Sequence, residues 1–159
     1  METPEGMDRV QSNLNLMEPL KKEGKLIRDE NFHLYITEKE KADYKNYMTA
    51  QGVDFNKPIV LAAVATRIEH KAWPKGRMAE VLHRILDNYD VQLIFNYGNE
   101  AEKDIACYYY ETLGKSPRIF INVEAKGLRE LSALSALSSF FFGNEGGPRH
   151  ISQAFEIPS

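Results

Sequence analysis

The chain has 159 residues, of which 43% are hydrophobic and 27% charged, and its formal net charge is −3. This length and composition are typical of a single globular domain with a sizeable hydrophobic core, and they exclude a disordered chain or a coiled coil. No apolar run reaches the roughly 20 residues of a membrane-spanning helix, the N-terminal residues lack an apolar signal-peptide core, and the net charge gives no argument for nucleic-acid binding.

The first part of the chain predicts helix, strand and helix. Apolar residues recur near helical spacing over residues 8–20, which predicts a short amphipathic helix. Residues 32–36 alternate as a short strand does. Thr37 and Glu40 then form a capping-box pattern at the start of a helix that we expect to end near Ala50. The segment 53–57 has the composition of a linker.

After Pro58 the sequence IVLAAVA is a continuous apolar run, which is typical of a strand covered on both faces. Strand and helix patterns then alternate with short connections: helices are predicted at 74–88, 100–113, 128–137 and 148–155, and strands at 91–95, 118–121 and 140–142. The alternation predicts an α/β fold with a doubly wound parallel sheet. We therefore divide the chain into a lead-in, residues 1–56, and a sheet domain, residues 57–159.

The last residues, 156–159, have the pattern of a lead-in to a further strand. We expect from this that the domain is truncated. The strand at 140–142 would then lack a neighbour on one side, and an apolar edge of that kind favours aggregation unless something covers it.

A glycine-rich turn follows the strand of three phenylalanines. Gly146 and Gly147 allow the backbone to approach a ligand, and Pro148 suits the first turn of a helix, whose N–H groups favour anions. Arg149 and His150 add side-chain donors on the same turn. This pattern predicts an anion site, although an ordinary strand-to-helix turn explains it equally well.

Polar residues cluster after three of the predicted strands, where ligands bind in open α/β sheets. The clusters provide donors for phosphates and carboxylates for vicinal hydroxyls, as a nucleotide sugar requires. Their members are Thr66, Arg67, His70 and Lys71; Asn96, Tyr97, Gly98, Asn99, Glu100 and Glu102; and Asn144, Glu145, Gly146, Gly147, Arg149 and His150.

Each cluster also has a purely structural interpretation. Arg67 and Lys71 are equally typical of solvated loop cations, and Glu100 and Glu102 of favourable charges in the first turn of a helix. For Trp73 and the run Tyr108, Tyr109 and Tyr110, packing is the favoured interpretation.

The lone cysteine, Cys107, forms no internal disulfide and fits a small buried side chain in a reducing compartment. Four scattered histidines provide no metal-ligand spacing.

Four segments resemble, in order and spacing, the C-terminal half of the family 9 glycosyltransferases, the heptosyltransferases and their relatives in lipopolysaccharide core synthesis. They are KAWP at 71–74, GNEAE at 98–102, LRELSAL at 128–134 and GNEGGPRH at 143–150. The resemblance covers roughly residues 8–159. It implies a two-domain GT-B enzyme whose C-terminal Rossmann-like domain binds the sugar nucleotide and whose N-terminal domain binds the acceptor. The first helix resembles the interdomain segment of the family.

The resemblance also assigns roles to residues. Thr66 and Lys71 match the loop that contacts the diphosphate, and Glu102 matches a carboxylate near the ribose. Glu145 matches the acidic residue near the donor sugar. Gly146, Gly147 and His150 match the turn over the phosphates, while Arg67 and Arg149 are included for their charge.

The family pattern usually has Asp at Glu145, Ser or Thr at Gly146 and an apolar residue at Arg149. These departures change the hydrogen bonds offered to the sugar, so ADP-heptose is only the family's default donor. The general base of the family lies in the N-terminal domain, and we therefore expect no catalytic residue in this chain.

The leading hypothesis is the donor-binding domain of an inverting, metal-independent glycosyltransferase of cell-envelope polysaccharide synthesis, with no cofactor. Its partners would be a nucleotide sugar and, through the N-terminal domain, a lipid-linked saccharide acceptor, but no nucleic acid. The location would be cytoplasmic, with the whole enzyme at the inner membrane. Two alternatives stay open. One is a flavodoxin-like or receiver-like interaction module, although the basic end Thr66-Arg67 of the first strand argues against a receiver. The other is a GT-B epimerase or hydrolase of sugar nucleotides.

Overall fold

The computed structural model describes residues 9–21 and 33–159, and the chain divides into two units, Met1–Phe32 and His33–Ser159. The first unit contains α1 (Arg9–Asn15) and α2 (Glu18–Lys21). A single helix over residues 8–20 is therefore wrong in its continuity, because the N–H groups of Leu16 and Met17 bond three residues back and close a turn between the helices. Residue 8 lies outside the described part.

The second unit contains a four-stranded parallel sheet in the order β3-β2-β1-β4. Its strands are β1 (Ile59–Ala63), β2 (Gln92–Phe95), β3 (Ile119–Phe120) and β4 (Phe140–Gly143). The chain builds outward from β1 to β3 and then returns to the other side of β1 for β4. Strand order thus reverses at β1, which confirms the predicted α/β doubly wound fold.

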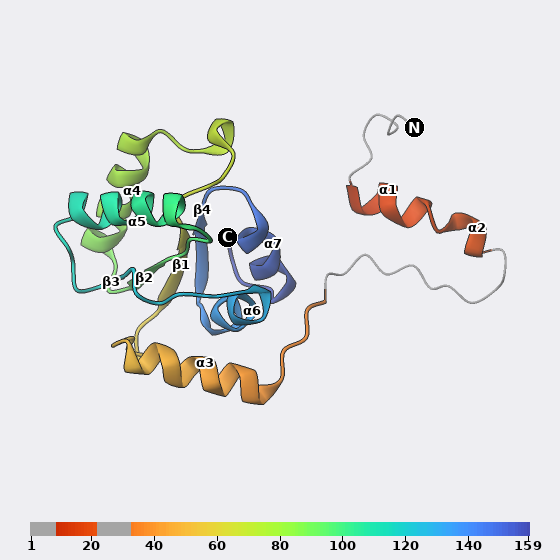
Figure 1. Ribbon diagram of the computed structural model, residues 1–159, viewed down its shortest axis with the longest axis horizontal. Coiled ribbons are helices and arrows are strands. Elements are labelled where there is room, and N and C mark those ends of the chain that lie inside the picture. Colours follow the sequence, from red (N-terminus) through yellow and green to blue (C-terminus); the bar gives the residue numbers. More distant parts are fainter. Residues whose placement is uncertain (1–8, 22–32) are drawn as a thin grey trace. The chain divides into compact units, whose positions relative to one another are not determined.

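Helices cover both faces of this sheet (Figure 1). Helices α4 (Lys75–Asn88) and α5 (Glu100–Thr112) lie on one face, and α3 (Glu38–Ala50) and α6 (Leu128–Leu137) lie on the other. The short helix η1 (Glu69–Lys71) follows β1, and α7 (Gly147–Ala154) follows β4. None of the helices in the described part of the chain has the length and apolar character needed to cross a membrane.

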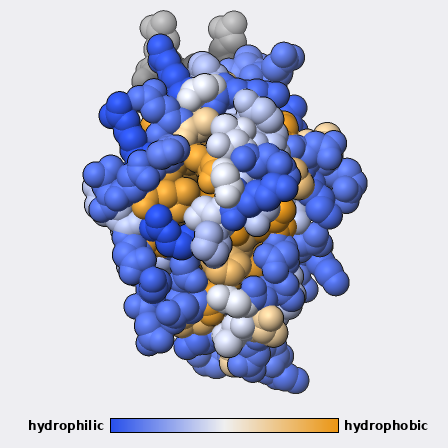
Figure 2. All heavy atoms as spheres, turned by 90° about the vertical axis from the view of Figure 1, so that its left-hand side faces the viewer, coloured by the Kyte–Doolittle hydropathy of each residue, from blue (hydrophilic) through white to orange (hydrophobic). Residues whose placement is uncertain are grey.

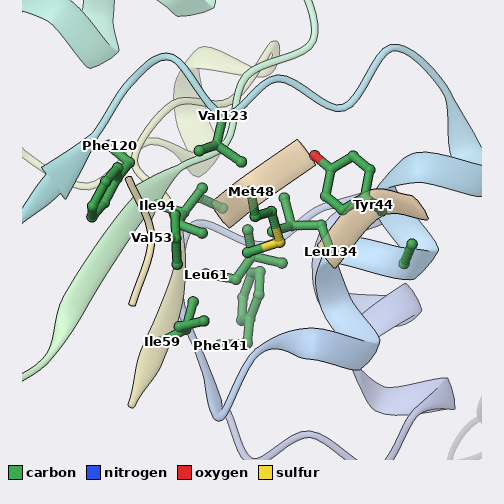
Figure 3. Close-up of a cluster of buried hydrophobic side chains, with 12 residues drawn as sticks. Tyr44, Met48, Val53, Ile59, Leu61, Ile94, Phe120, Val123, Leu134 and Phe141 are labelled. Atoms are coloured by element: carbon green, nitrogen blue, oxygen red, sulfur yellow. The ribbon is translucent and has the colours of Figure 1, made fainter. Parts of the chain in front are cut away.

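The two faces have separate hydrophobic cores because successive residues of a strand point to opposite sides. Val60 and Ala62 pack against α4 and α5, whereas Ile59 and Leu61 pack against α3 and α6. Figure 3 shows the second core, in which Met48 of α3 and Leu134 of α6 meet Leu61 and Phe141 of the sheet. On the surface seen in Figure 2, hydrophilic side chains predominate and apolar ones show between them.

Three predictions for residues 32–57 need correction. Residues 33–36 form no strand, since they pair with none of the sheet strands, and Leu34 and Tyr35 are exposed; residue 32 lies outside the described part. The expected linker contributes Val53 to the core. We also expected the domain to begin at residue 57, but α3 packs against α6 and belongs to the unit that begins at His33.

The capping box at the start of α3 is confirmed and also joins α3 to α6. Thr37 N–H donates to Glu40 Oε2 over 2.8 Å, and Glu40 N–H donates to Thr37 Oγ1 over 3.2 Å. The guanidinium of Arg129 in α6 donates to both carboxylate oxygens of Glu40. These bonds, led by those from Arg129, lower the pKa of Glu40 to about 2.

The segment after α7 lies beside β4. Phe141 N–H donates to the Pro158 carbonyl oxygen over 2.8 Å, and Ile157 packs against the core of Figure 3. The outer edge of β4 is thus covered at this position, where we had expected a missing neighbour. The run of three phenylalanines is only partly buried, since Phe140 keeps 42% of its surface exposed while Phe141 is buried.

Gly143 ends β4 where the strand comes closest to β1. Its φ of 135° lies in the region that favours glycine, and a Cβ atom placed there would lie 2.3 Å from the Ala63 carbonyl oxygen. Neither backbone can move away without breaking the parallel pairing of Ala63 with Gly143.

Replacing Gly143 by Ala should therefore lower the free energy of unfolding by about 3 kcal/mol or more, as measured by urea denaturation. The matched control is Gly76→Ala in α4, where a Cβ atom would meet nothing within 4 Å. That change should leave stability the same or raise it by up to about 1 kcal/mol. A similar small effect for both variants would contradict the close approach of the strands.

Candidate functional site

A cleft of about 570 Å³ lies at the carboxyl ends of β1 and β4, where the strand order reverses. Open α/β sheets bind ligands at such a switch point, because the loops diverge there and leave a crevice. Of the nine predicted donor-binding residues, those that line this cleft are Thr66, Arg67, Lys71, Glu102, Glu145, Gly146 and Gly147. Three loops that are far apart in sequence thus meet at one site.

Lys71 and Glu145 form an ion pair across the cleft. Lys71 is the last residue of η1, and Glu145 lies in the loop between β4 and α7. Hydrogen bonding and charge from Lys71 are the main causes that lower the pKa of Glu145, with smaller contributions from His150 and Arg149. Lys71 and Glu145 therefore balance each other's charge across the cleft.

A second charged pair closes the other side. Glu102 Oε2 accepts a hydrogen bond from Gly98 N–H over 2.6 Å, and Glu102 Oε1 lies 3.5 Å from Arg67 Nε. Asn99 caps the same helix, because its side chain accepts from Glu102 N–H over 2.9 Å. Glu102 is thus a favourable charge in the first turn of α5, as its structural interpretation predicted. The same carboxylate also faces the cleft.

The start of α7 differs in part from the predicted anion site. Pro148 lies in the first turn, as expected. However, the N–H groups of Arg149 and His150 donate to the Gly146 carbonyl oxygen, over 3.1 and 3.5 Å, and so are engaged within the helix. The two side chains do not line the cleft, although His150 Nε2 lies 3.9 Å from Glu145 Oε1.

One wall of the cleft was missed by the sequence interpretation. It comes from the segment between β3 and α6, from α6 and from α7, and its residues are Ala125, Lys126, Gly127, Leu128, Leu131 and Ile151. The rule that ligands bind at the carboxyl ends of strands also applies to β3. Applied there, the rule would have included Lys126 and Gly127 among the candidate site residues. Tyr97 also lines the cleft; its hydroxyl lies 2.7 Å from the Ile121 carbonyl oxygen and 2.9 Å from Glu124 Oε1.

The aromatic residues for which packing was the favoured interpretation do not line the cleft. Trp73 packs edge-on against Phe142, with ring centroids 5.9 Å apart. Tyr109 is buried in the core beside α4, whereas Tyr108 is exposed. Among the described residues, no group of three or more His, Cys, Asp or Glu side chains is arranged to hold a metal ion.

Comparison with known proteins places this chain in a family. The model of glycosyltransferase family 9 (heptosyltransferase) matches residues 1–159. The chain belongs to glycosyltransferase family 9. This membership confirms the resemblance drawn from the four sequence segments and speaks against the receiver-like alternative.

Individual family members match only part of their own length. Lipopolysaccharide heptosyltransferase 1 of Campylobacter coli is 28% identical over 106 residues, which are 65% of this chain and 31% of that protein. A solved family 9 glycosyltransferase from Veillonella parvula has a TM-score of 0.67 at 19% identity and covers 89% of this chain but 40% of its own. The E. coli ADP-heptose lipopolysaccharide heptosyltransferase II has a TM-score of 0.63 at 17% identity, with coverages of 84% and 40%. At these identities the structures show a shared fold, over less than half of each relative.

The ion pair of the cleft makes a prediction for pH titration. Replacing Lys71 by Met should raise the pKa of Glu145 toward its ordinary value, because the first-named cause of its lowering is removed. A carboxyl with a lowered native pKa adds stability above its unfolded pKa and loses it as pH falls through the native value. As the pH falls through the native pKa of Glu145, the variant should therefore lose less stability than the wild type.

Carboxyl-detected NMR titration measures the change directly. The pKa of Glu40, which Arg129 lowers to about 2 in a different part of the unit, serves as the internal control and should not move. A Glu145 pKa that is the same with Lys71 and with Met at position 71 would show that the pair does not form in solution.

Proposed function

We propose that the chain is the sugar-nucleotide-binding domain of an inverting, metal-independent glycosyltransferase of lipopolysaccharide synthesis. The supporting observation is that Lys71, Arg67 and the glycine turn line one cleft at the switch point of the sheet. Cationic side chains and exposed backbone suit a diphosphate, and carboxylates on the same rim suit sugar hydroxyls. By analogy with the two-domain relatives, this would be the C-terminal domain.

The diphosphate would lie between Lys71 and the turn at Gly146 and Gly147. The side chain of Lys71 is about one-third exposed and can turn from Glu145 toward a phosphate oxygen. A Cβ atom at Gly147 would meet nothing within 4 Å, so the turn leaves room for close approach of a ligand. Arg67, whose side chain is 73% exposed, can reach the same ligand from the opposite side.

The remaining parts of a nucleotide sugar also find suitable surroundings. Glu102 is held by Gly98 and can accept hydrogen bonds from ribose hydroxyls, and Glu145 can accept them from the donor sugar. The wall formed by Leu128, Leu131 and Ile151 suits a flat base, because it is apolar and open at Leu128. ADP-heptose, named for the E. coli relative, is the donor we propose.

In the proposed reaction, an acceptor hydroxyl attacks the anomeric carbon from the face opposite the leaving nucleoside diphosphate. The bond from that carbon to the diphosphate oxygen breaks, and negative charge develops on the leaving group. Lys71 and Arg67 would stabilise this charge in place of a divalent cation. The general base and the site for a lipid-linked saccharide acceptor would be supplied by the other domain, in a cytoplasmic enzyme at the inner membrane.

Titration calorimetry with ADP, UDP and GDP tests the nucleotide site. At least one of them should bind saturably, and EDTA should leave the affinity unchanged. Replacing Lys71 by Ala should weaken binding by about 1.5–3 kcal/mol, roughly ten- to a hundredfold, through loss of charge-assisted contacts.

Lys57 provides a matched control, because it is also paired, with Asp90 at 2.9 Å, and precedes β1 at the opposite end of the strand. Lys57→Ala should leave the affinity unchanged. A folded chain that binds none of the three nucleotides would contradict the proposal, and equal losses for the two lysine variants would remove Lys71 from the site.

A separate prediction concerns Glu145. Because its carboxylate balances Lys71 and repels phosphates, Glu145→Gln should bind ADP severalfold more tightly than the wild type. The affinity for ADP-heptose should rise less or fall, because Gln accepts weaker hydrogen bonds from sugar hydroxyls. Competition binding measures the ratio of the two affinities. A ratio unchanged by the substitution would mean that Glu145 does not face the sugar.

A further inference from the structure

Asn144 is a buried amide at the base of the cleft, with only 3% of its surface exposed. Its side-chain Nδ2 donates to the Ala63 carbonyl oxygen over 3.1 Å, and its own backbone N–H donates to the same oxygen over 2.9 Å. Its Oδ1 accepts a hydrogen bond from the backbone N–H of Trp73 over 2.9 Å. One side chain therefore bonds both the end of β1 and the loop between β1 and α4.

These contacts connect the two loops that carry the ion pair. Trp73 follows Lys71 by two residues, and Asn144 directly precedes Glu145. The loop of Lys71 has little other support from regular structure, since η1 has only three residues. A hydrogen bond from Asn144 to the Trp73 backbone thus limits how far Lys71 can move from the start of α7.

The chemistry of the position suits an amide. The Ala63 carbonyl oxygen can accept a second hydrogen bond beside the one from the Asn144 backbone, and the Trp73 N–H needs an acceptor; a single asparagine side chain supplies both groups. An aliphatic side chain of the same shape would leave the Trp73 N–H without its present partner, which is costly at a part-buried site. The loop would then move toward water to satisfy this group.

We propose that Asn144 is a positioning residue that holds Lys71 opposite the glycine turn before the nucleotide binds. It touches no ligand in this scheme and acts through Trp73 and Lys71. The effect on nucleotide affinity rests on the proposed function, whereas the restraint of the loop does not. Asn144 thereby reduces the cost of ordering the loop when the diphosphate arrives.

Trp73 makes the proposal directly testable, because it is the only tryptophan of the 159-residue chain. It is 45% exposed and packs edge-on against Phe142, so release of the loop should shift its emission to longer wavelength and increase its quenching by acrylamide. The variant is Asn144→Leu, which keeps the shape of the side chain. Loss of the restraint should also weaken ADP binding by about five- to tenfold.

Gln92 is the control for general loss of stability. It is an equally buried amide whose Oε1 accepts from Asp54 N–H over 2.9 Å and whose Nε2 donates to the Asp54 carbonyl over 2.7 Å. It begins β2, at the end of the sheet away from the cleft. Gln92→Met should lower stability as Asn144→Leu does, but it should change neither the Trp73 signal nor the ADP affinity.

The milder variant Asn144→Ser keeps a polar group and the backbone bond to Ala63, and it serves if Asn144→Leu does not fold. Greater quenching of Trp73 with weaker ADP binding, both absent in Gln92→Met, supports the proposal. Unchanged Trp73 quenching in the Asn144 variant overturns it, as does wild-type ADP affinity or an equal effect of Gln92→Met. If the wild-type chain binds no ADP, the proposed function fails, and the Trp73 signal alone then decides whether Asn144 restrains the loop.

Discussion

The close contact of β4 with β1 at Ala63 is the constraint on which the site depends. The Ala63 carbonyl oxygen accepts hydrogen bonds from the backbone and the side chain of Asn144, and Gly143 leaves no room for a Cβ atom beside it. This contact lies at the switch point of the sheet, so it sets the separation of the loops after the two strands. The close approach of the β1 and β4 backbones at Gly143 thus allows Lys71 and Glu145 to meet across the cleft.

Four charged side chains of the cleft are arranged in two pairs. Lys71 is balanced by Glu145, and Arg67 lies near Glu102, so in the proposed function the diphosphate competes with carboxylates already in place. The contacts are partly exposed to solvent, which keeps the cost of separating each pair small. Under the proposed function, Lys71 and Arg67 would exchange these carboxylates for phosphate oxygens. The selectivity of the proposed site would then depend on the ligand hydroxyls that Glu145 and Glu102 can bind.

The position of α7 follows from its contact with α6. Ser135 and Ser152 are both fully buried, and their hydroxyl oxygens lie 3.3 Å apart. Small side chains allow the two helices to approach closely, which leaves Ile151 at the cleft wall and the glycine turn at its rim. The segment after α7 returns along β4 through the bond from Phe141 N–H to Pro158. The core on this side of the sheet therefore also orients the proposed phosphate turn.

The sequence alone determined the elements whose signals are local. It correctly predicted the strand β1 from its apolar run, the capping box of Thr37 and the bounds of α6, because these features depend on neighbouring residues. It also indicated most of the cleft, since strand ends in a parallel sheet converge. Only the tertiary structure decided that residues 33–36 form no strand and that α3 belongs to the domain, because both depend on packing against distant elements. The pairing of Lys71 with Glu145, 74 residues away, and the double role of Asn144 likewise arise from contacts that no local pattern encodes.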